Sequence, residues 1–365
     1  MKKWIICILT ILVMGITVIV YRGFTMSFED YLDLAETFHE RKAYDQEMFN
    51  LERALDDSLE LNGPLSMQTA DIYRRMGACG RSKDEIVENF DKAIRIYEME
   101  NRKDVAALYF EKGKALMEKK TGTVVSLVRE SMEKAVELYE KDGFEYSDNY
   151  CESCVILAYL ATDYDISWDY LQKAERNFEN LSKENEWRIG SVIYRSMGMH
   201  RFNGEMYEEA VKYLDVVLTQ AEGSEKKDVR RVEAEVRYIS GGALVCLGKV
   251  EEGKERIEKS IRFYDTYKGT LPYRDAAIAH AFLALAYGNM EPPEKQKVLD
   301  EGEAALSYFK QQKTITSDDF QTMGYIKYYL SLAYEKAFPE KGDVDFERWF
   351  NEISRLNAAE YEFFY

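Results

Sequence analysis

The sequence is poor in residues that break regular structure and in those that carry most enzyme chemistry. Its 365 residues include only 5 prolines and 21 glycines, fewer than an all-β chain of this length needs for its turns. The three histidines, His39, His200 and His280, are far apart and show no ligand spacing. The sequence contains no glycine-rich phosphate loop or hydrolase nucleophile motif. We therefore expect a helical chain that is not an enzyme and holds no metal or cofactor.

Cysteine is also scarce, with five residues too scattered for a disulfide framework. Cys151 and Cys154 form a CxxC pair, which would suit a thioredoxin-like site or half of a zinc site. The first needs a βαβ context and the second needs two further ligands, and the sequence offers neither. Because residues three apart share one face of a helix, we predict that this pair packs between helices. A redox role is the alternative.

Positive charge is in deficit. The chain has 49 Lys and Arg against 66 Asp and Glu, for a net charge of −17. So acidic a chain repels phosphate backbones, and we expect no nucleic-acid partner. Hydrophobic residues make up 46% of the sequence, which is enough for an extensive core and unlike a disordered chain.

One uncharged run is long enough to span a bilayer, at residues 4–21, which read WIICILTILVMGITVIVY. Eighteen helical residues span about 27 Å, close to the hydrocarbon thickness of a bilayer. We predict that residues 1–26 are a transmembrane anchor with its flanks, in contact with the lipid bilayer through residues 4–21. A cleaved signal peptide is the alternative. Lys2 and Lys3 precede the run and only Arg22 follows it closely, so the sequence predicts a single-pass membrane protein with a cytoplasmic N-terminus and an extracytoplasmic main domain.

Helical periodicity dominates the rest of the chain. The clearest unit is residues 192–218, where apolar side chains recur at steps of three and four, as on one face of a helix. Gly204 and Glu205 fall where a short turn would divide this unit into two helices. Ser82 and Glu85 form a capping box at the start of another predicted helix. Further breaks occur at 61–66, 119–123, 221–227, 267–275, 290–295 and 338–343.

Small residues recur at a fixed spacing in two of these units. Gly198 and Ala210 are twelve residues apart, and a second unit, residues 238–261, carries Gly241 and Gly253 at the same spacing. A bulky side chain at such a position would force two packed helices apart. In the tetratricopeptide repeat family, which these units resemble, the small residues lie where the two helices of a pair touch, so the resemblance implies a helix contact at each couple.

These units resemble the tetratricopeptide repeat (TPR), a family of stacked helix–turn–helix units. The resemblance is carried by Tyr194, Met197, Gly198, Tyr207, Ala210, Leu214 and Val217. The units are longer than the family's standard repeat, like those of kinesin light chains and of bacterial peptide-responsive regulators. The sequence thus predicts an all-α fold, an α-solenoid of about eight TPR-like helix pairs over residues 27–365 with a C-terminal cap, preceded by one N-terminal transmembrane helix. Stacked pairs share one continuous core, so no domain boundary is required.

The resemblance also implies a function, because TPR proteins bind extended peptides or partner helices on the concave face formed by their first helices. The motif register places seven residues on that face: Phe110, Tyr159, Arg195, Phe202, Asn203, Tyr238 and Tyr328. Aromatic residues and arginine are favoured binding anchors, although such residues also pack between repeats. We expect a membrane-anchored, non-catalytic scaffold for a protein or peptide partner, similar to TPR proteins of bacterial envelopes. The alternative is a receptor for a short signalling peptide that acts through a separate output protein.

Overall fold

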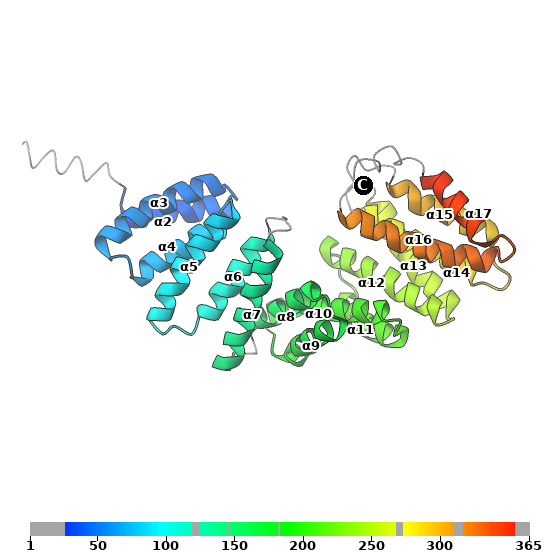
Figure 1. Cartoon of the computed structure of the whole chain (residues 1–365), viewed down its shortest axis with the longest axis horizontal. Helices are drawn as coiled ribbons and strands as arrows, with labels where there is room; N and C mark the ends of the chain where they lie inside the picture. The colour runs from blue at the N-terminus through cyan, green and yellow to red at the C-terminus, as the bar shows by residue number, and fades with distance from the viewer. Residues whose placement is uncertain are drawn as a thin grey trace, which may run out of the picture. The chain divides into compact units, whose positions relative to one another are not determined.

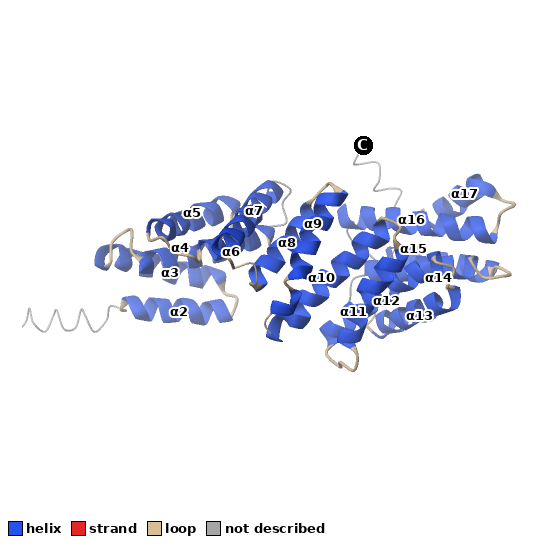
Figure 2. Ribbon diagram, turned by 90° about the horizontal axis from the view of Figure 1, so that it is seen from below, coloured by secondary structure: helices blue, strands red, loops and turns tan. Residues whose placement is uncertain are grey.

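The computed structural model describes residues 26–118, 124–144, 147–181, 183–267, 273–309 and 317–354. Within these ranges all regular structure is helical, and short loops join the helices (Figure 2). The first eight α-helices are α2 (Phe28–Glu40), α3 (Tyr44–Leu61), α4 (Met67–Cys79), α5 (Lys83–Met99), α6 (Val105–Met117), α7 (Val125–Asp142), α8 (Asp148–Leu160) and α9 (Tyr164–Arg176). The next eight are α10 (Lys183–Asn203), α11 (Tyr207–Ala221), α12 (Lys227–Cys246), α13 (Val250–Thr266), α14 (Tyr273–Gly288), α15 (Lys295–Phe309), α16 (Ser317–Ala337) and α17 (Gly342–Ser354).

These helices follow one another as eight helix–turn–helix pairs, as the sequence predicted. The predicted breaks at 61–66, 221–227, 290–295 and 338–343 fall at junctions between helices, whereas 119–123 and most of 267–275 lie outside the described residues. The chain divides into two compact units, residues 1–173 and 174–365, with the division inside α9 (Figure 1). Each unit is a stack of helix pairs. The single uninterrupted solenoid over 27–365 stays a prediction.

In the first unit, α2 packs with α3, α4 with α5, and α6 with α7, and each pair contacts the next. Helix α5 shows why these residues form such a stack. Its buried side chains include Ile86, Phe90, Ala93 and Tyr97, at steps of three and four along one face. The predicted capping box is confirmed at the start of this helix. The Ser82 hydroxyl accepts a hydrogen bond from the backbone N–H of Glu85, and the Glu85 carboxylate accepts one from the backbone N–H of Ser82.

A buried charge in the first pair departs from the repeat pattern. Glu47 stands where TPR units carry a small residue, yet it is only 2% exposed in the contact between α2 and α3. Its carboxylate lies 3.0 Å from the Nδ1 atom of His39 on the facing helix. A buried carboxylate needs such a partner because its desolvation is costly. Because His39 pairs with its carboxylate, Glu47 can occupy a buried position where the repeat pattern has a small residue.

The core of the second unit is built around α14, which packs against α12, α13, α15 and α16. This helix buries side chains on nearly all its faces, among them Ala277, Ala281, Phe282 and Leu285. A helix that is apolar all round belongs in the middle of a packed structure. Trp349 of α17 stacks on Tyr334 of α16 at 5.5 Å between ring centroids, while the predicted C-terminal cap stays a prediction.

The two predicted glycine contacts are confirmed. A Cβ atom added at Gly198 would meet the side chain of Leu214 and come within 3.4 Å of the Ala210 carbonyl oxygen. The contact between α12 and α13 is closer still, since a Cβ at Gly241 would lie 2.7 Å from the Gly253 carbonyl oxygen. In both pairs the two helices can approach this closely because glycine has no side chain.

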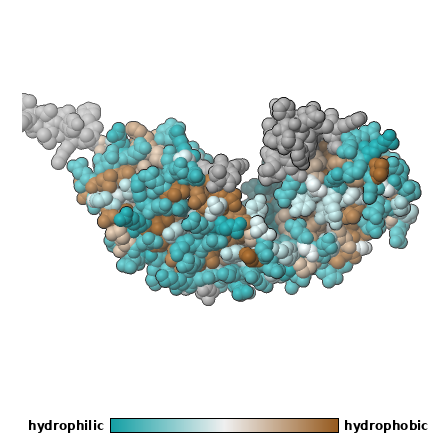
Figure 3. All heavy atoms as spheres, viewed as in Figure 1, coloured by the Kyte–Doolittle hydropathy of each residue, from teal (hydrophilic) through white to brown (hydrophobic). Residues whose placement is uncertain are grey.

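The membrane-spanning part of the predicted fold class is corrected. Among the residues that the structure describes, no helix has the length and apolar character needed to cross a bilayer. The described helices carry charged residues on the faces that do not pack, and hydrophilic residues cover most of the face seen in Figure 3. This finding corrects the predictions of a transmembrane helix before the solenoid and of a single-pass membrane protein. Segment 4–21, with its predicted bilayer contact, lies outside the described residues.

Candidate functional site

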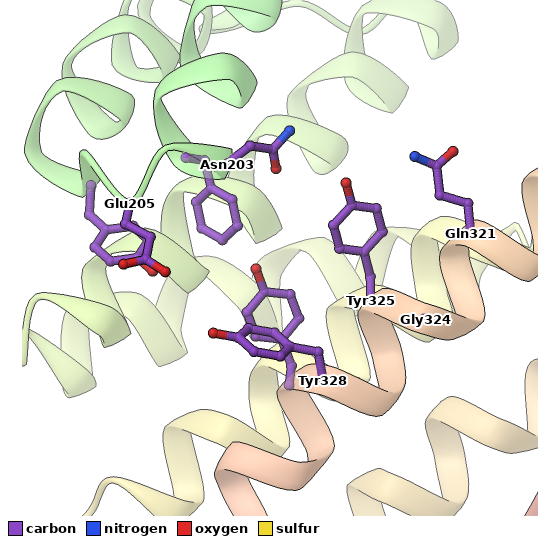
Figure 4. Close-up of a pocket in the computed structure, with 9 residues that line it drawn as sticks. Asn203, Glu205, Gln321, Gly324, Tyr325 and Tyr328 are labelled. Atoms are coloured by element: carbon purple, nitrogen blue, oxygen red, sulfur yellow. The ribbon is translucent and has the colours of Figure 1, made fainter. Parts of the chain in front are cut away.

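A cavity of about 480 Å³ lies in the second unit, between the α10–α11 turn and α16 (Figure 4). Three of the seven predicted groove residues, Phe202, Asn203 and Tyr328, meet there. The described residues that line it are Phe202, Asn203, Glu205, Tyr207, Gln321, Gly324, Tyr325, Tyr328 and Tyr329. The cavity is the candidate site because it joins exposed aromatic rings to polar groups in one concave place.

One wall is made by the turn that the sequence predicted at 204–205. Helix α10 ends at Asn203, and the amide of Glu205 then donates to the Phe202 carbonyl oxygen at 3.0 Å. Glu205 adopts a left-handed backbone conformation with φ of 60°, which reverses the chain within two residues. Tyr207 begins α11 directly afterwards. The tight turn thus places four lining residues on one wall although they come from two helices.

The facing wall is one side of α16. Gln321, Gly324, Tyr325 and Tyr328 follow at steps of three, one and three, which puts them on one face of a helix. Figure 4 shows the two labelled tyrosines projecting from α16 toward the α10–α11 turn. Tyr325 is 38% exposed and Tyr328 50% exposed. These rings are available to a ligand without unpacking the core.

The floor of the cavity is an aromatic cluster that joins α10, α14 and α16. The Phe202 ring lies 5.6 Å from the Phe282 ring and 6.2 Å from the Tyr329 ring, and the latter two are 4.4 Å apart. Such separations are typical of favourable aromatic pairs. Gly242 of α12 makes room, because a Cβ there would lie 2.7 Å from the Phe282 ring. The cluster fixes the distance between the two walls.

The polar groups of the cavity are phenols, amides and one carboxylate. Burial, followed by the neighbouring Cys246, raises the pKa of Tyr207 above its usual value. The same causes raise the pKa of Tyr329. Both phenols therefore keep their protons at neutral pH and act as hydrogen-bond donors. The nine described lining residues include no basic side chain.

Two further predicted residues, Tyr238 and Arg195, lie in the same unit but do not line the cavity. The Tyr238 ring is 5% exposed and stacks behind the floor, 6.2 Å from the Phe282 ring. Arg195 of α10 donates to the carboxylate of Glu235 on α12 at 2.8 Å. Burial, followed by repulsion from Glu235, raises the pKa of nearby Asp275 to about 6. These side chains pack and pair between repeats, which was the alternative interpretation for groove residues.

The remaining two predicted groove residues, Phe110 and Tyr159, belong to the first unit. Phe110 is buried at 7% exposure, and the Lys114 ammonium lies 5.8 Å from the centre of its ring. Tyr159 on α8 is 84% exposed. Phe110 thus packs within its unit, whereas Tyr159 is open to solvent at the end of its helix. Neither belongs to the cavity of the second unit.

The CxxC pair lies inside the first unit. Cys151 and Cys154 are both 0% exposed on α8. Burial raises the pKa of each thiol to about 12, so both stay protonated and unreactive at neutral pH. No group of His, Cys, Asp or Glu side chains in the described part of the chain is arranged to hold a metal ion. The geometry agrees with packing between helices.

Several lining residues escaped the sequence analysis. Tyr207 was assigned only a core position in the repeat, and Glu205 only a turn. The α16 residues Gln321, Gly324 and Tyr325 carry a usable signal, since with Tyr328 they form one stripe on the helix. The sequence does not show, however, which other helix or turn this side of α16 faces.

Comparisons with known proteins support the fold. No model of a known protein family matches the sequence, and no curated protein matches it detectably. The structure is similar to a signal transduction ATPase with numerous domains and a tetratricopeptide repeat sensor from Pyrococcus horikoshii, with a TM-score of 0.50 and 14% identity. That match covers 92% of this chain and 53% of the archaeal protein, so the chain spans about half of its length.

A second solved structure is the TPR2AB domain of yeast Sti1 in complex with pHSP90, at 14% identity, covering 84% of this chain and 98% of that one. Its TM-score of 0.28 is too low to support an argument. At 14% identity the archaeal match shows the fold alone. The chain is a helical-repeat protein whose fold is similar to that of a TPR-containing structure.

Proposed function

We propose that this chain is a non-catalytic scaffold that binds a protein or peptide segment in the cavity of its second unit. The supporting observation is the pair of exposed rings, Tyr325 and Tyr328, beside a cavity of about 480 Å³. Small-molecule sites in proteins have volumes of roughly 300–1,000 Å³, so a cavity of this size has room for side chains of a bound peptide. A tyrosine side chain buries a large surface area while few of its bonds lose rotational freedom, and its hydroxyl can hydrogen-bond to a peptide backbone. Both properties suit a peptide site.

The chemistry of the lining favours binding over catalysis. Its nine described residues include no serine, cysteine, lysine or histidine. The Ser–His and Cys–His pairs of many enzymes therefore have no members among these residues. Phenols, amides and a carboxylate instead supply hydrogen-bond partners of the kind that orient a ligand.

The test is selection of peptides from a random display library on the immobilised full-length chain. Selected peptides are then measured by fluorescence polarisation against wild type and the double variant Tyr325→Ala/Tyr328→Ala. Tyrosines at the centre of an interface commonly contribute 1–2 kcal/mol each or more, so we expect binding to weaken about tenfold or more. Unchanged affinity in the double variant would overturn the proposal.

The matched control is Tyr44→Ala. Tyr44 is 44% exposed, between the exposures of the two cavity tyrosines, and it lies in the first unit. Its replacement should leave peptide affinity unchanged. A signalling-peptide receptor, the alternative function, requires in addition that a selected peptide changes the solution scattering profile of the chain.

A further inference from the structure

The described lining of the cavity combines aromatic rings with one carboxylate and includes no basic side chain. Five of its nine described lining residues are aromatic, namely Phe202, Tyr207, Tyr325, Tyr328 and Tyr329. The face of an aromatic ring attracts a cation within about 6 Å of its centre. Several rings around one space form the kind of cage that holds an ammonium or guanidinium group.

The single carboxylate at the cavity, that of Glu205, has no cationic partner among the described residues. Two acidic groups of the same unit are paired, Glu209 with Arg201 at 3.0 Å and Glu235 with Arg195 at 2.8 Å, whereas Glu205 and the exposed Glu208 have no such partner among the described residues. Glu205 is exposed, and the hydrogen-bonded turn after α10 holds its backbone beside the cavity (Figure 4). Its charge is therefore available to a ligand.

Gly324 gives an independent indication that the cavity is kept open. Every other described helical glycine with negative φ would place a Cβ closer than 3.0 Å to a neighbouring atom, so packing explains it. A Cβ at Gly324 would have nothing within 4 Å. Glycine inside a helix costs roughly 0.5–1 kcal/mol relative to alanine. Packing does not require a glycine here, and the missing side chain leaves this side of the cavity clear.

We propose that the cavity binds the cationic side chain of a lysine or arginine presented by a peptide partner, a specificity that rests on the proposed function. The aromatic rings enclose the apolar stem and attract the charged head, and Glu205 pairs with that head. A chain of net charge −17 also attracts basic segments at long range. Acidic peptides meet the Glu205 carboxylate with like charge and are rejected.

The probe is the same random peptide library, selected on the full-length chain. We expect the selected peptides to be enriched in lysine or arginine. In a selected peptide, acetyl-lysine replaces each lysine and citrulline each arginine, which keeps the length and removes the charge. Affinity should then fall about tenfold or more, and the affinity of the basic peptide should fall as NaCl is raised.

Two variants test the site itself. Glu205→Gln should weaken the basic peptide about fivefold, with Glu208→Gln, an exposed carboxylate three residues away, as the matched control that leaves it unchanged. Gly324→Leu should abolish binding by filling the cavity, and its unfolding midpoint shows that the chain remains folded.

The outcomes separate the two proposals. Selected peptides without basic residues whose binding is lost in Tyr325→Ala/Tyr328→Ala would overturn the cationic specificity and leave the scaffold function standing. Equal effects of Glu205→Gln and Glu208→Gln would also overturn it. Binding that survives both the tyrosine double variant and Gly324→Leu would overturn both proposals.

Discussion

A single added methyl group should weaken the contact between α12 and α13. In Gly241→Ala the new Cβ would lie 2.7 Å from the Gly253 carbonyl oxygen and 2.7 Å from the Ile257 side chain. In the opposite direction, a Cβ at Gly253 would lie 2.6 Å from the Gly241 carbonyl oxygen. A carbonyl oxygen belongs to the helix backbone and cannot rotate away as a side chain can. The two helices must therefore move apart to accept the substitution.

The size of the effect follows from two opposing terms. Overpacking a close contact costs about 1–3 kcal/mol. Alanine returns roughly 0.5–1 kcal/mol through its better helix propensity. We expect Gly241→Ala to lower the free energy of unfolding by about 1–2 kcal/mol. Gly324→Ala meets no neighbouring atom, so the same exchange should raise it by roughly 0.5–1 kcal/mol.

The assay is urea unfolding of the full-length chain, followed by circular dichroism at 222 nm. Repeat stacks can unfold in parts, so hydrogen exchange across residues 227–266 should locate the loss to α12 and α13. Gly324→Ala is the control for helix propensity. A Gly241→Ala chain as stable as the Gly324→Ala chain would show that α12 and α13 do not approach as closely as described.

Three further predictions concern buried titratable groups. His39→Ala leaves the Glu47 carboxylate buried without this partner and should lower the free energy of unfolding by about 1–3 kcal/mol, whereas adding Glu47→Ala should restore most of the loss in the same urea assay. Because the pKa of Asp275 is raised to about 6 in the folded chain, the folded state holds this proton more tightly, and Asp275 lowers stability as pH rises from about 4 to 6. Asp275→Asn should therefore gain roughly 2–3 kcal/mol over wild type at pH 7 and less than about 1 kcal/mol at pH 4; a gain independent of pH would contradict this. Iodoacetamide should label exposed Cys246 in the folded chain and reach buried Cys154 only after denaturation, as mass spectrometry of peptides can show.

The sequence alone was sufficient to predict the local structure. Apolar residues at steps of three and four define the helix faces, and breaks that contain glycine or proline mark several of the junctions between helices. The Ser82 capping box and the Gly241–Gly253 contact follow from neighbouring parts of the chain, where spacing determines geometry directly. The same regularity explains why the pairs and their number were predictable.

The sequence pattern did not predict the exposure of residues whose surroundings are formed by another repeat. Phe110 and Tyr238 occupy groove positions in the register, but both are buried against neighbouring helices. Cys151 and Cys154 were assigned to packing because two further zinc ligands were missing, and burial agrees. The predicted membrane anchor rested on composition alone, and no described helix supports it.

The cavity could be recognised only in the tertiary structure. Phe202 and Tyr328 lie on α10 and α16, and they meet because small rotations between successive helix pairs add up over three steps. The sequence determines each pair and the face it buries. The sum of those rotations depends on side-chain packing at every interface between pairs, including the fit of Phe282 against Gly242. For that reason the exposed tyrosines were visible in the sequence, whereas the space they enclose was not.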